Sequence, residues 1–300
     1  MVDLIIIGAG PAGITSSVYA SRKKIDFIVI TKDIGGQATW SADIENYPGY
    51  QFITGPDLVA KFQEHMRNYG MRLNENEEVV ELEKRDGIIH VKTTKSSYEA
   101  KTAIISSGKR VKELGVPGEK EYKNKGVAYC VTCDGPLFSG KDVAVVGGGN
   151  SALDAAIQMM NIANRVYLIN ITDKITGDAI MQEKVANNPK VRIMHNTRVE
   201  SITGDRFVRG INVNTGAKKE TLDVKGVFIE IGLMPNSWFA RGVDKNEKNE
   251  IIVNCANETS VPGIFAAGDV TNVPEKQIVI AAGDGAKAAL GAFRYLARLK

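Results

Sequence analysis

The chain has 300 residues, of which 43% are hydrophobic and 24% are charged, and its 38 basic and 35 acidic side chains give a formal net charge of +3. This length suits two domains, and the composition is typical of a soluble globular protein. The near balance of charge gives no indication of a nucleic-acid or membrane surface. Apolar runs fall short of the roughly 20 residues of a membrane helix. Because a strand pattern begins by Val2, no signal peptide is expected, and we predict a cytoplasmic protein.

The chain opens on a pattern typical of a nucleotide-binding fold. A β-rich run, Asp3–Ile7, leads into a glycine turn at 8–13, a helix to about Ser21 and a second strand at Phe27–Ile30. In G-x-G-x-x-G the glycines allow a tight turn, close approach of a pyrophosphate and close packing of helix on strand. Free amides at the helix N-terminus then bind the phosphates. The predicted residues of this first dinucleotide site are Gly8, Gly10, Pro11, Ala12 and Gly13.

A second copy of the pattern follows about 140 residues later. The strand Asp142–Val146, a glycine turn, a helix at 151–162 and the strand Val166–Ile169 repeat the first unit. Its predicted phosphate-binding residues are Gly147, Gly149, Asn150, Ser151 and Ala152. The acidic residue that holds a ribose hydroxyl about 20 residues further on is missing in both copies, where Thr31 and Asn170 follow the second strands.

Short alternating strands at 78–106 and again at 199–231 predict a β-meander after each copy. Turn residues at 112–118 and a polar stretch at 242–250 are candidate boundaries. The sequence therefore predicts an α/β fold with two Rossmann-like dinucleotide-binding domains. The first domain, residues 1–113 and 243–300, is interrupted by the second, residues 114–242.

Between the two glycine turns lies a Cys-x-x-Cys, formed by Cys130 and Cys133, with Asp134 directly after it. A close pair of this kind, in a chain with one further cysteine, indicates redox chemistry. The two sulfurs can close a small disulfide and reopen it by exchange. Asp134 suits a general acid, although Asp134-Gly135-Pro136 is also strong turn sequence, so a structural role stays open. No metal site is expected, because a structural zinc needs about four ligands and no histidine lies near Cys130.

At this point the sequence resembles low-molecular-weight thioredoxin reductases, from Leu4 to about Leu296. The resemblance rests on the run 130–135, the loop 145–151 and the segments 45–49 and 263–269. It implies FAD on the first domain, a homodimer and a second domain that swivels. It also implies that Cys133 lies nearest the flavin and that Cys130 is the interchange thiol. The further flavin-contacting residues that it implies are Gly35, Gly36, Gln37, Asn46, Gly268, Asp269, Gln277, Ile278 and Val279.

The stretches 133–138 and 226–235 resemble one branch in particular, the reductase portion of the alkyl hydroperoxide reductase flavoprotein subunit. The chain lacks the N-terminal thioredoxin-like domains of that subunit. We therefore expect a separate partner, which is thioredoxin, a glutaredoxin-like protein or a peroxiredoxin-linked redox protein.

The electron donor is the open point. NADPH-using members carry a His-Arg-Arg run and a further Arg where this chain has Asn170, Ile171, Thr172 and Thr176. A 2′-phosphate would lack charged partners there, whereas Asn170 could bond a ribose hydroxyl. We predict an FAD-dependent disulfide reductase that uses NADH rather than NADPH. The alternatives are a degenerate nicotinamide site fed by ferredoxin or deazaflavin, a dithiol oxidase that makes hydrogen peroxide, and a non-catalytic redox-responsive flavoprotein.

Overall fold

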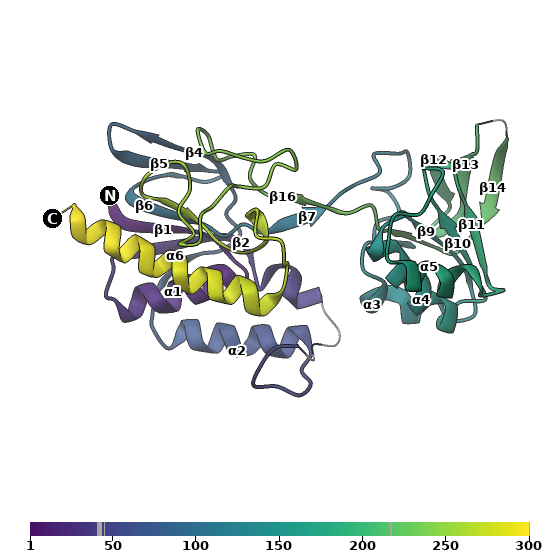
Figure 1. Ribbon diagram of the computed structural model, residues 1–300, viewed down its shortest axis with the longest axis horizontal. Helices are drawn as coiled ribbons and strands as arrows, with labels where there is room; N and C mark the ends of the chain where they lie inside the picture. Colours follow the sequence, from purple (N-terminus) through teal and green to yellow (C-terminus); the bar gives the residue numbers. More distant parts are fainter. Residues whose placement is uncertain (41–43, 45, 217, 300) are drawn as a thin grey trace. The chain divides into compact units, whose positions relative to one another are not determined.

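The computed structural model describes residues 1–40, 44, 46–216 and 218–299, and for Trp40, Thr132 and Cys133 it describes the backbone alone. Glu45, within one of the family-like segments, lies outside the described residues. The chain forms two compact units, Met1–Arg110 with Met234–Lys300, and Val111–Leu233. Figure 1 shows the elements of each.

The first unit is built on a mixed sheet. Strands β3, β2, β1 and β6 lie parallel in that order, and β17 adds in parallel to the C-terminal half of β6. Antiparallel β5 and β4 extend from the N-terminal half of β6. The strands are β1 (Val2–Ala9), β2 (Phe27–Ile34), β3 (Arg72–Asn74), β4 (Val79–Arg85), β5 (Ile88–Thr93), β6 (Ser97–Ile105) and β17 (Ile264–Ala266).

Alternate residues of β1 supply two separate cores. Leu4 and Ile6 pack with the helices α1 and α6, whereas Ile5 and Ile7 pack with the β4–β5 hairpin and residues 239–251. The helices α1, α2 and α6 lie on one side of the sheet (Figure 1). The helices are α1 (Pro11–Arg22), η1 (Gly36–Trp40), α2 (Gly55–Arg67), η3 (Gly268–Val270) and α6 (Ile278–Arg298).

The second unit has a five-stranded parallel sheet in the order β11, β10, β9, β15, β8 and a separate antiparallel sheet in the order β12, β13, β14. The strands are β8 (Val127–Ala128), β9 (Asp142–Val146), β10 (Arg165–Ile169), β11 (Val191–Met194), β12 (Arg198–Gly204), β13 (Val208–Asn214), β14 (Lys219–Asp223) and β15 (Gly226–Ile229). The helices are α3 (Val131–Asp134), η2 (Gly135–Phe138), α4 (Asn150–Ile162) and α5 (Ala179–Ala186).

Two strands predicted as parts of meanders belong instead to the parallel sheets. Residues 103–105 of β6 pair with β1 and β17, and β15 lies between β9 and β8. All four residues of β15 are buried. A strand covered on both faces reads as a continuous apolar run, which is the signature of a central parallel strand and not of an alternating hairpin.

The chain crosses between the units at 110/111 and at 233/234. The two crossing segments, β7 (Lys109–Val111) and β16 (Leu233–Pro235), pair with each other. The polar stretch at 242–250 led us to predict the second boundary at 242/243. Phe239 and Ala240, however, are buried in the core of the first unit, and the Leu82 amide donates to the Phe239 carbonyl, so the first unit resumes before residue 239. In the part of the chain that the structure describes, no helix combines the length and apolarity needed to cross a membrane.

Candidate functional site

The first glycine turn has no room for a side chain at Gly8 or Gly13. A Cβ on Gly8 (φ +98°) would lie 2.5 Å from the Ser106 carbonyl oxygen, and a Cβ on Gly13 would lie 1.8 Å from that of Gly8. Gly10 is the N-cap of α1 and no side chain caps the helix, while Pro11 at its first turn has no N–H to satisfy. The next amides of α1 are therefore available to an anionic group such as a pyrophosphate.

The predicted flavin-contacting segments meet around this turn within the first unit. A Cβ on Gly36 would lie 3.7 Å from the Gly10 Cα, and one on Gly268 would lie 3.0 Å from the Ala12 Cβ. The amide of Gly35 donates to the Ala9 carbonyl.

Two side chains connect the segments further. Gln37 Nε2 donates to the Lys109 carbonyl at 3.0 Å, and Asn46 Nδ2 donates to Gln277 Oε1 at 3.0 Å. Gln277 is the N-cap of α6, so Ile278 and Val279 form its first turn. Two of these segments thus approach the glycine turn, and Asn46 bonds to the start of α6, an arrangement that suits a single extended ligand.

Asp269 supports a polyhydroxy ligand at this place. Its side chain makes no hydrogen bond or ion pair with the described residues, although it is only partly exposed. Burial raises the pKa of its carboxyl group, and the charges of Lys276 and Lys109 oppose that rise. A half-buried acceptor without an internal donor is costly unless a ligand supplies one. The ribityl chain of FAD carries such hydroxyl donors, so the residues fit this cofactor.

A buried ion cluster that the sequence patterns did not indicate lies beside these segments. Lys109 Nζ lies 2.8 Å and Lys276 Nζ 3.3 Å from Glu250 Oε1, and Asn246 Nδ2 donates to Glu250 Oε2. Burial alone would raise the pKa of Glu250, but the hydrogen bonds from Lys109 and Asn246 and the lysine charges outweigh it and bring the pKa to about 2. The cluster connects the backbone that accepts Gln37 with the segment that leads to Gln277.

The second glycine turn repeats the first. A Cβ on Gly147 (φ +147°) would lie 2.2 Å from the Glu230 carbonyl oxygen, and Gly149 caps α4 with no side-chain bond. Ser151 is exposed and Ala152 is fully buried in the first turn of α4. The Asn150 side chain is already used, because its Oδ1 accepts the Asp178 amide at 2.7 Å.

Asn170 is 3% exposed, and its side chain is turned into its own loop. Its Nδ2 donates to the carbonyls of Thr172 at 3.1 Å and Lys174 at 2.8 Å. Its Oδ1 accepts from both the amide and the hydroxyl of Thr172. The carboxamide predicted to bond a ribose hydroxyl is therefore occupied by internal partners, and the neighbouring Ile171 is 62% exposed.

Glu230 is an acidic residue at the second turn that sequence reasoning missed. It follows β15 directly, and its amide donates to the Val146 carbonyl at the end of β9. Sheet order reverses between β10–β9 and β15, which is where ligands bind in doubly wound sheets. Burial, and then the charge of Asp154, raise the pKa of Glu230 to about 7. Its position after a fully buried apolar strand is the signal that could have identified it.

The dithiol lies in the second unit, after β8. Cys130 is disulfide-bonded, and the short helix α3 begins directly after it, with the Asp134 amide donating to the Cys130 carbonyl at 3.1 Å. The side chain of Cys133 lies outside the described part. Burial raises the pKa of Asp134, which favours a carboxyl group that can hold a proton. Cys255 is a free, exposed thiol, and no cluster of possible metal ligands occurs among the described side chains.

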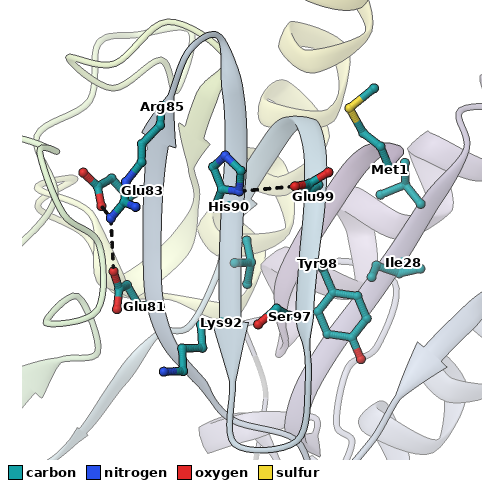
Figure 2. A pocket seen from close by; sticks show the side chains of 12 residues that line it. Met1, Ile28, Glu81, Glu83, Arg85, His90, Lys92, Ser97, Tyr98 and Glu99 are labelled. Atoms are coloured by element: carbon teal, nitrogen blue, oxygen red, sulfur yellow. Dashed lines mark hydrogen bonds and ion pairs between the residues drawn. The ribbon is translucent and has the colours of Figure 1, made fainter.

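A cavity of about 480 Å³ lies on the strands β4 to β6, where Figure 2 shows its lining side chains. Several polar groups of its lining contact one another: His90 Nδ1 lies 3.6 Å from Glu99 Oε1, and Arg85 pairs with Glu81 and Glu83. None of the predicted site residues lines it, so the redox chemistry is not assigned to this cavity.

Comparison with known proteins agrees with the geometry. A family model described as pyridine nucleotide-disulphide oxidoreductase matches residues 2–285. The chain is 42% identical over 300 residues to a protein named NADH dehydrogenase from Bacillus subtilis (strain 168), covering 99% of this chain and 59% of that protein. It is 43% identical over 304 residues to the F subunit of alkyl hydroperoxide reductase in Xanthomonas campestris pv. phaseoli, covering 99% and 57%. The chain thus spans well under two thirds of the length of these curated relatives.

Among solved structures, a thioredoxin reductase from Lactococcus lactis in its FR conformation matches with a TM-score of 0.84 and 32% identity. That match covers 99% of this chain and 100% of the other. A thioredoxin reductase from T. acidophilum matches with a TM-score of 0.80 and 37% identity, covering 98% of each chain. The predicted α/β architecture with two nucleotide-binding folds is confirmed.

Proposed function

The chain belongs to the pyridine nucleotide-disulphide oxidoreductase family and is of the thioredoxin reductase type, and on that premise we propose that it is an FAD-dependent disulfide reductase. Electrons pass from a donor through FAD and the Cys130–Cys133 pair to a thioredoxin-like protein. The observation that carries the proposal is the combination, in one chain, of a glycine turn with an unpartnered Asp269 and a disulfide-bonded Cys130 followed by Asp134. FAD, when bound, supplies two-electron transfer between the donor and the disulfide.

The residues of the chain bind the cofactor, handle a proton and carry out the thiol exchange. Gly8, Gly10 and Gly13 hold the pyrophosphate, and Asp269 accepts hydrogen bonds from the ribityl chain. Two electrons and two protons convert the disulfide to a dithiol, and Asp134 handles one of these protons. The Cys130 thiolate then attacks the partner disulfide, releasing one partner thiol and forming a mixed disulfide. Cys133 attacks the Cys130 sulfur, which releases the second partner thiol and restores the intramolecular disulfide.

For the donor we propose NADH over NADPH. Charge-assisted bonds to a 2′-phosphate contribute about 1.5–3 kcal/mol each, and no arginine stands at 170–176 to provide them. A second candidate is a protein or deazaflavin donor. The observation that favours it is Asn170, whose carboxamide is fully occupied within its own loop.

Anaerobic stopped-flow reduction of the FAD-loaded protein separates these possibilities. We expect NADH to bleach the flavin absorbance with a higher kcat/KM than NADPH. If only reduced ferredoxin or reduced deazaflavin bleaches the flavin, that compound and not NADH is the donor. The proposed transfer from FAD to the Cys130–Cys133 pair would be unaffected. Bleaching by a small dithiol with hydrogen peroxide release would indicate an oxidase. If no donor reduces the flavin, the reductase proposal is wrong.

Cysteine variants test the order of the two thiols. We expect Cys130→Ser to keep flavin reduction, to lose turnover with thioredoxin, and to show long-wavelength thiolate–flavin absorbance from Cys133. Cys133→Ser should lack that absorbance and trap a mixed disulfide through Cys130. The opposite assignment of absorbance would reverse the two roles. We also propose a homodimer, as the resemblance implies, which light scattering at micromolar concentration can check.

A further inference from the structure

A buried carboxylate connects the residue before Cys130 with the turn by which the chain begins the second unit. Glu119 is 1% exposed. Its Oε1 accepts the Tyr129 hydroxyl at 2.8 Å and the Leu114 amide at 2.9 Å, and its Oε2 accepts the Gly115 amide at 2.7 Å. We call residues 114–119 the linking turn, because they follow the crossing at 110/111.

The three hydrogen bonds satisfy both oxygens of this buried side chain. An isolated carboxylate in an apolar interior is strongly disfavoured, and three short hydrogen bonds offset that cost. Burial, together with the bond to Glu119, raises the pKa of Tyr129 above its usual range, so its hydroxyl stays a donor throughout the neutral region. Lys123 Nζ also lies 5.3 Å from the centre of the Tyr129 ring.

Backbone pairing alone holds the start of the dithiol segment weakly. The strand before it, β8, has two residues and lies at the edge of the sheet beside β15, and its Val127 also bonds to the backbone of Tyr122 and Asn124. Because β8 ends at Ala128, the bond from the Tyr129 hydroxyl to Glu119 is a described contact that holds the residue next to Cys130. Without that contact, the Cys130 backbone would have more freedom than in-line attack on a sulfur allows.

Tyr129 and the linking turn also belong to one apolar core. Leu114 and Val116 of the linking turn and Tyr129 all pack against the same core cluster of the second unit. The polar contact between Glu119 and Tyr129 therefore lies beside apolar packing that involves both segments.

We propose that Glu119 and Tyr129 are positioning residues for thiol–disulfide exchange at Cys130. They fix the backbone before this cysteine to the linking turn, so that its sulfur is held for attack. The inference rests on the proposed role of Cys130 as the interchange thiol. It adds that the exchange step depends on a tyrosine–carboxylate contact outside the Cys-x-x-Cys itself.

The test uses the FAD-loaded protein with Tyr129→Phe, which removes one hydroxyl and keeps the ring. After reduction with dithiothreitol and its removal, the rate at which Cys130 reacts with the small disulfide DTNB is followed from pH 5 to 9. The dithiol potential is measured in glutathione buffers. We expect exchange to slow about tenfold to a hundredfold, in the range for a misplaced reacting group. The apparent pKa of Cys130 and the potential should shift, while the flavin spectrum stays unchanged.

Tyr122→Phe is the matched control. Tyr122 is buried in the same core cluster, and among the hydrogen bonds described for Glu119 none involves it. It should exchange at the wild-type rate with the wild-type pH profile. If Tyr129→Phe matches this control in rate, pH profile and potential, the inference is wrong.

Glu119→Gln provides a second route if the phenylalanine variant does not fold. Glutamine offers the Tyr129 hydroxyl a neutral acceptor in place of a carboxylate oxygen and sets an amide donor against the Gly115 amide, so the contact weakens and exchange should slow again. Because both changes act on the same contact, the double variant should lose little more than the worse single variant, whereas fully additive losses would contradict one shared contact. A wild-type protein whose Cys130 does not react with DTNB would instead overturn the proposed function, and this inference with it.

Discussion

Glu230→Gln should change how the stability of the second unit depends on pH. The pKa of Glu230 is raised from its ordinary 4.5 to about 7 by burial and by Asp154. The folded protein therefore binds a proton more tightly than the unfolded chain does. Below pH 4.5 the carboxyl is neutral in both states and costs nothing. As pH rises from 4.5 to about 7, the carboxyl ionises in the unfolded chain but keeps its proton in the folded protein. The free energy of unfolding therefore falls across that range.

The magnitude follows from the size of the change in pKa. One pKa unit corresponds to about 1.36 kcal/mol, so a rise from 4.5 to about 7 disfavours folding by about 3 kcal/mol once the pH exceeds both values. Water penetration and relaxation reduce this, and about 1–3 kcal/mol is the expected range. Glutamine has nearly the same shape and no charge. The difference in stability between the variant and the wild type should be small at pH 5 and grow to that amount at pH 8.

Urea unfolding at pH 5, 6, 7 and 8, followed by far-UV circular dichroism, measures the effect. Glu183→Gln on α5 is the control, because Glu183 is exposed and makes no side-chain bond among the described residues. The free energy of unfolding of this control should differ from that of the wild type by the same amount at every pH. If the Glu230 variant also differs from the wild type by a constant amount from pH 5 to 8, the Glu230 carboxyl is ionised throughout this range and the reasoning is refuted.

Three further changes test the candidate site. Gly13→Ala would place a Cβ 1.8 Å from the Gly8 carbonyl oxygen, so the purified protein should lose bound FAD, whereas Gly283→Ala, with open space around its Cβ position, should retain it by absorbance. Asp134→Asn should slow disulfide reduction by about tenfold to a thousandfold and flatten its pH profile, and an unchanged rate at neutral pH would leave Asp134 as a turn residue. Glu250→Gln should cost about 3 kcal/mol in urea unfolding, because two partly buried lysines lose their counter-charge. The surface pair partner Glu64→Gln should cost under about 0.5 kcal/mol, and equal losses would contradict the cluster's role.

The features that the sequence predicted well are local. The two strand–glycine turn–helix units follow from side-chain periodicity and from glycine geometry within about 20 residues, and the structure places β1–α1 and β9–α4 there. The segments around Gly36, Gln277 and Asp269 were identified by resemblance, and their meeting around the first turn required the structure.

The features that escaped prediction depend on contacts between distant residues. The position of β15 beside β9 is decided by burial on both faces, which periodicity alone cannot distinguish from a hairpin strand. The direction of the Asn170 side chain depends on two carbonyls of its own loop, and the Glu119–Tyr129 contact on a carboxylate ten residues away. Side chains that bond to backbone leave no repeating pattern in a sequence.

The return of the C-terminal segment to the first unit has a consequence for how the protein is made. β17 and α6 leave the ribosome after the second unit, although they pair with β6 and cover α1, which emerge before it. Residues 111–233 are contiguous, so the second unit can complete its core during synthesis while the first still lacks its covering helix. A truncated chain that ends near residue 240 and has left the ribosome should therefore hold a protease-resistant second unit behind an N-terminal portion that proteases cut and that chaperones recognise. Folding of this chain during synthesis thus starts from its middle and is completed by its C-terminal segment.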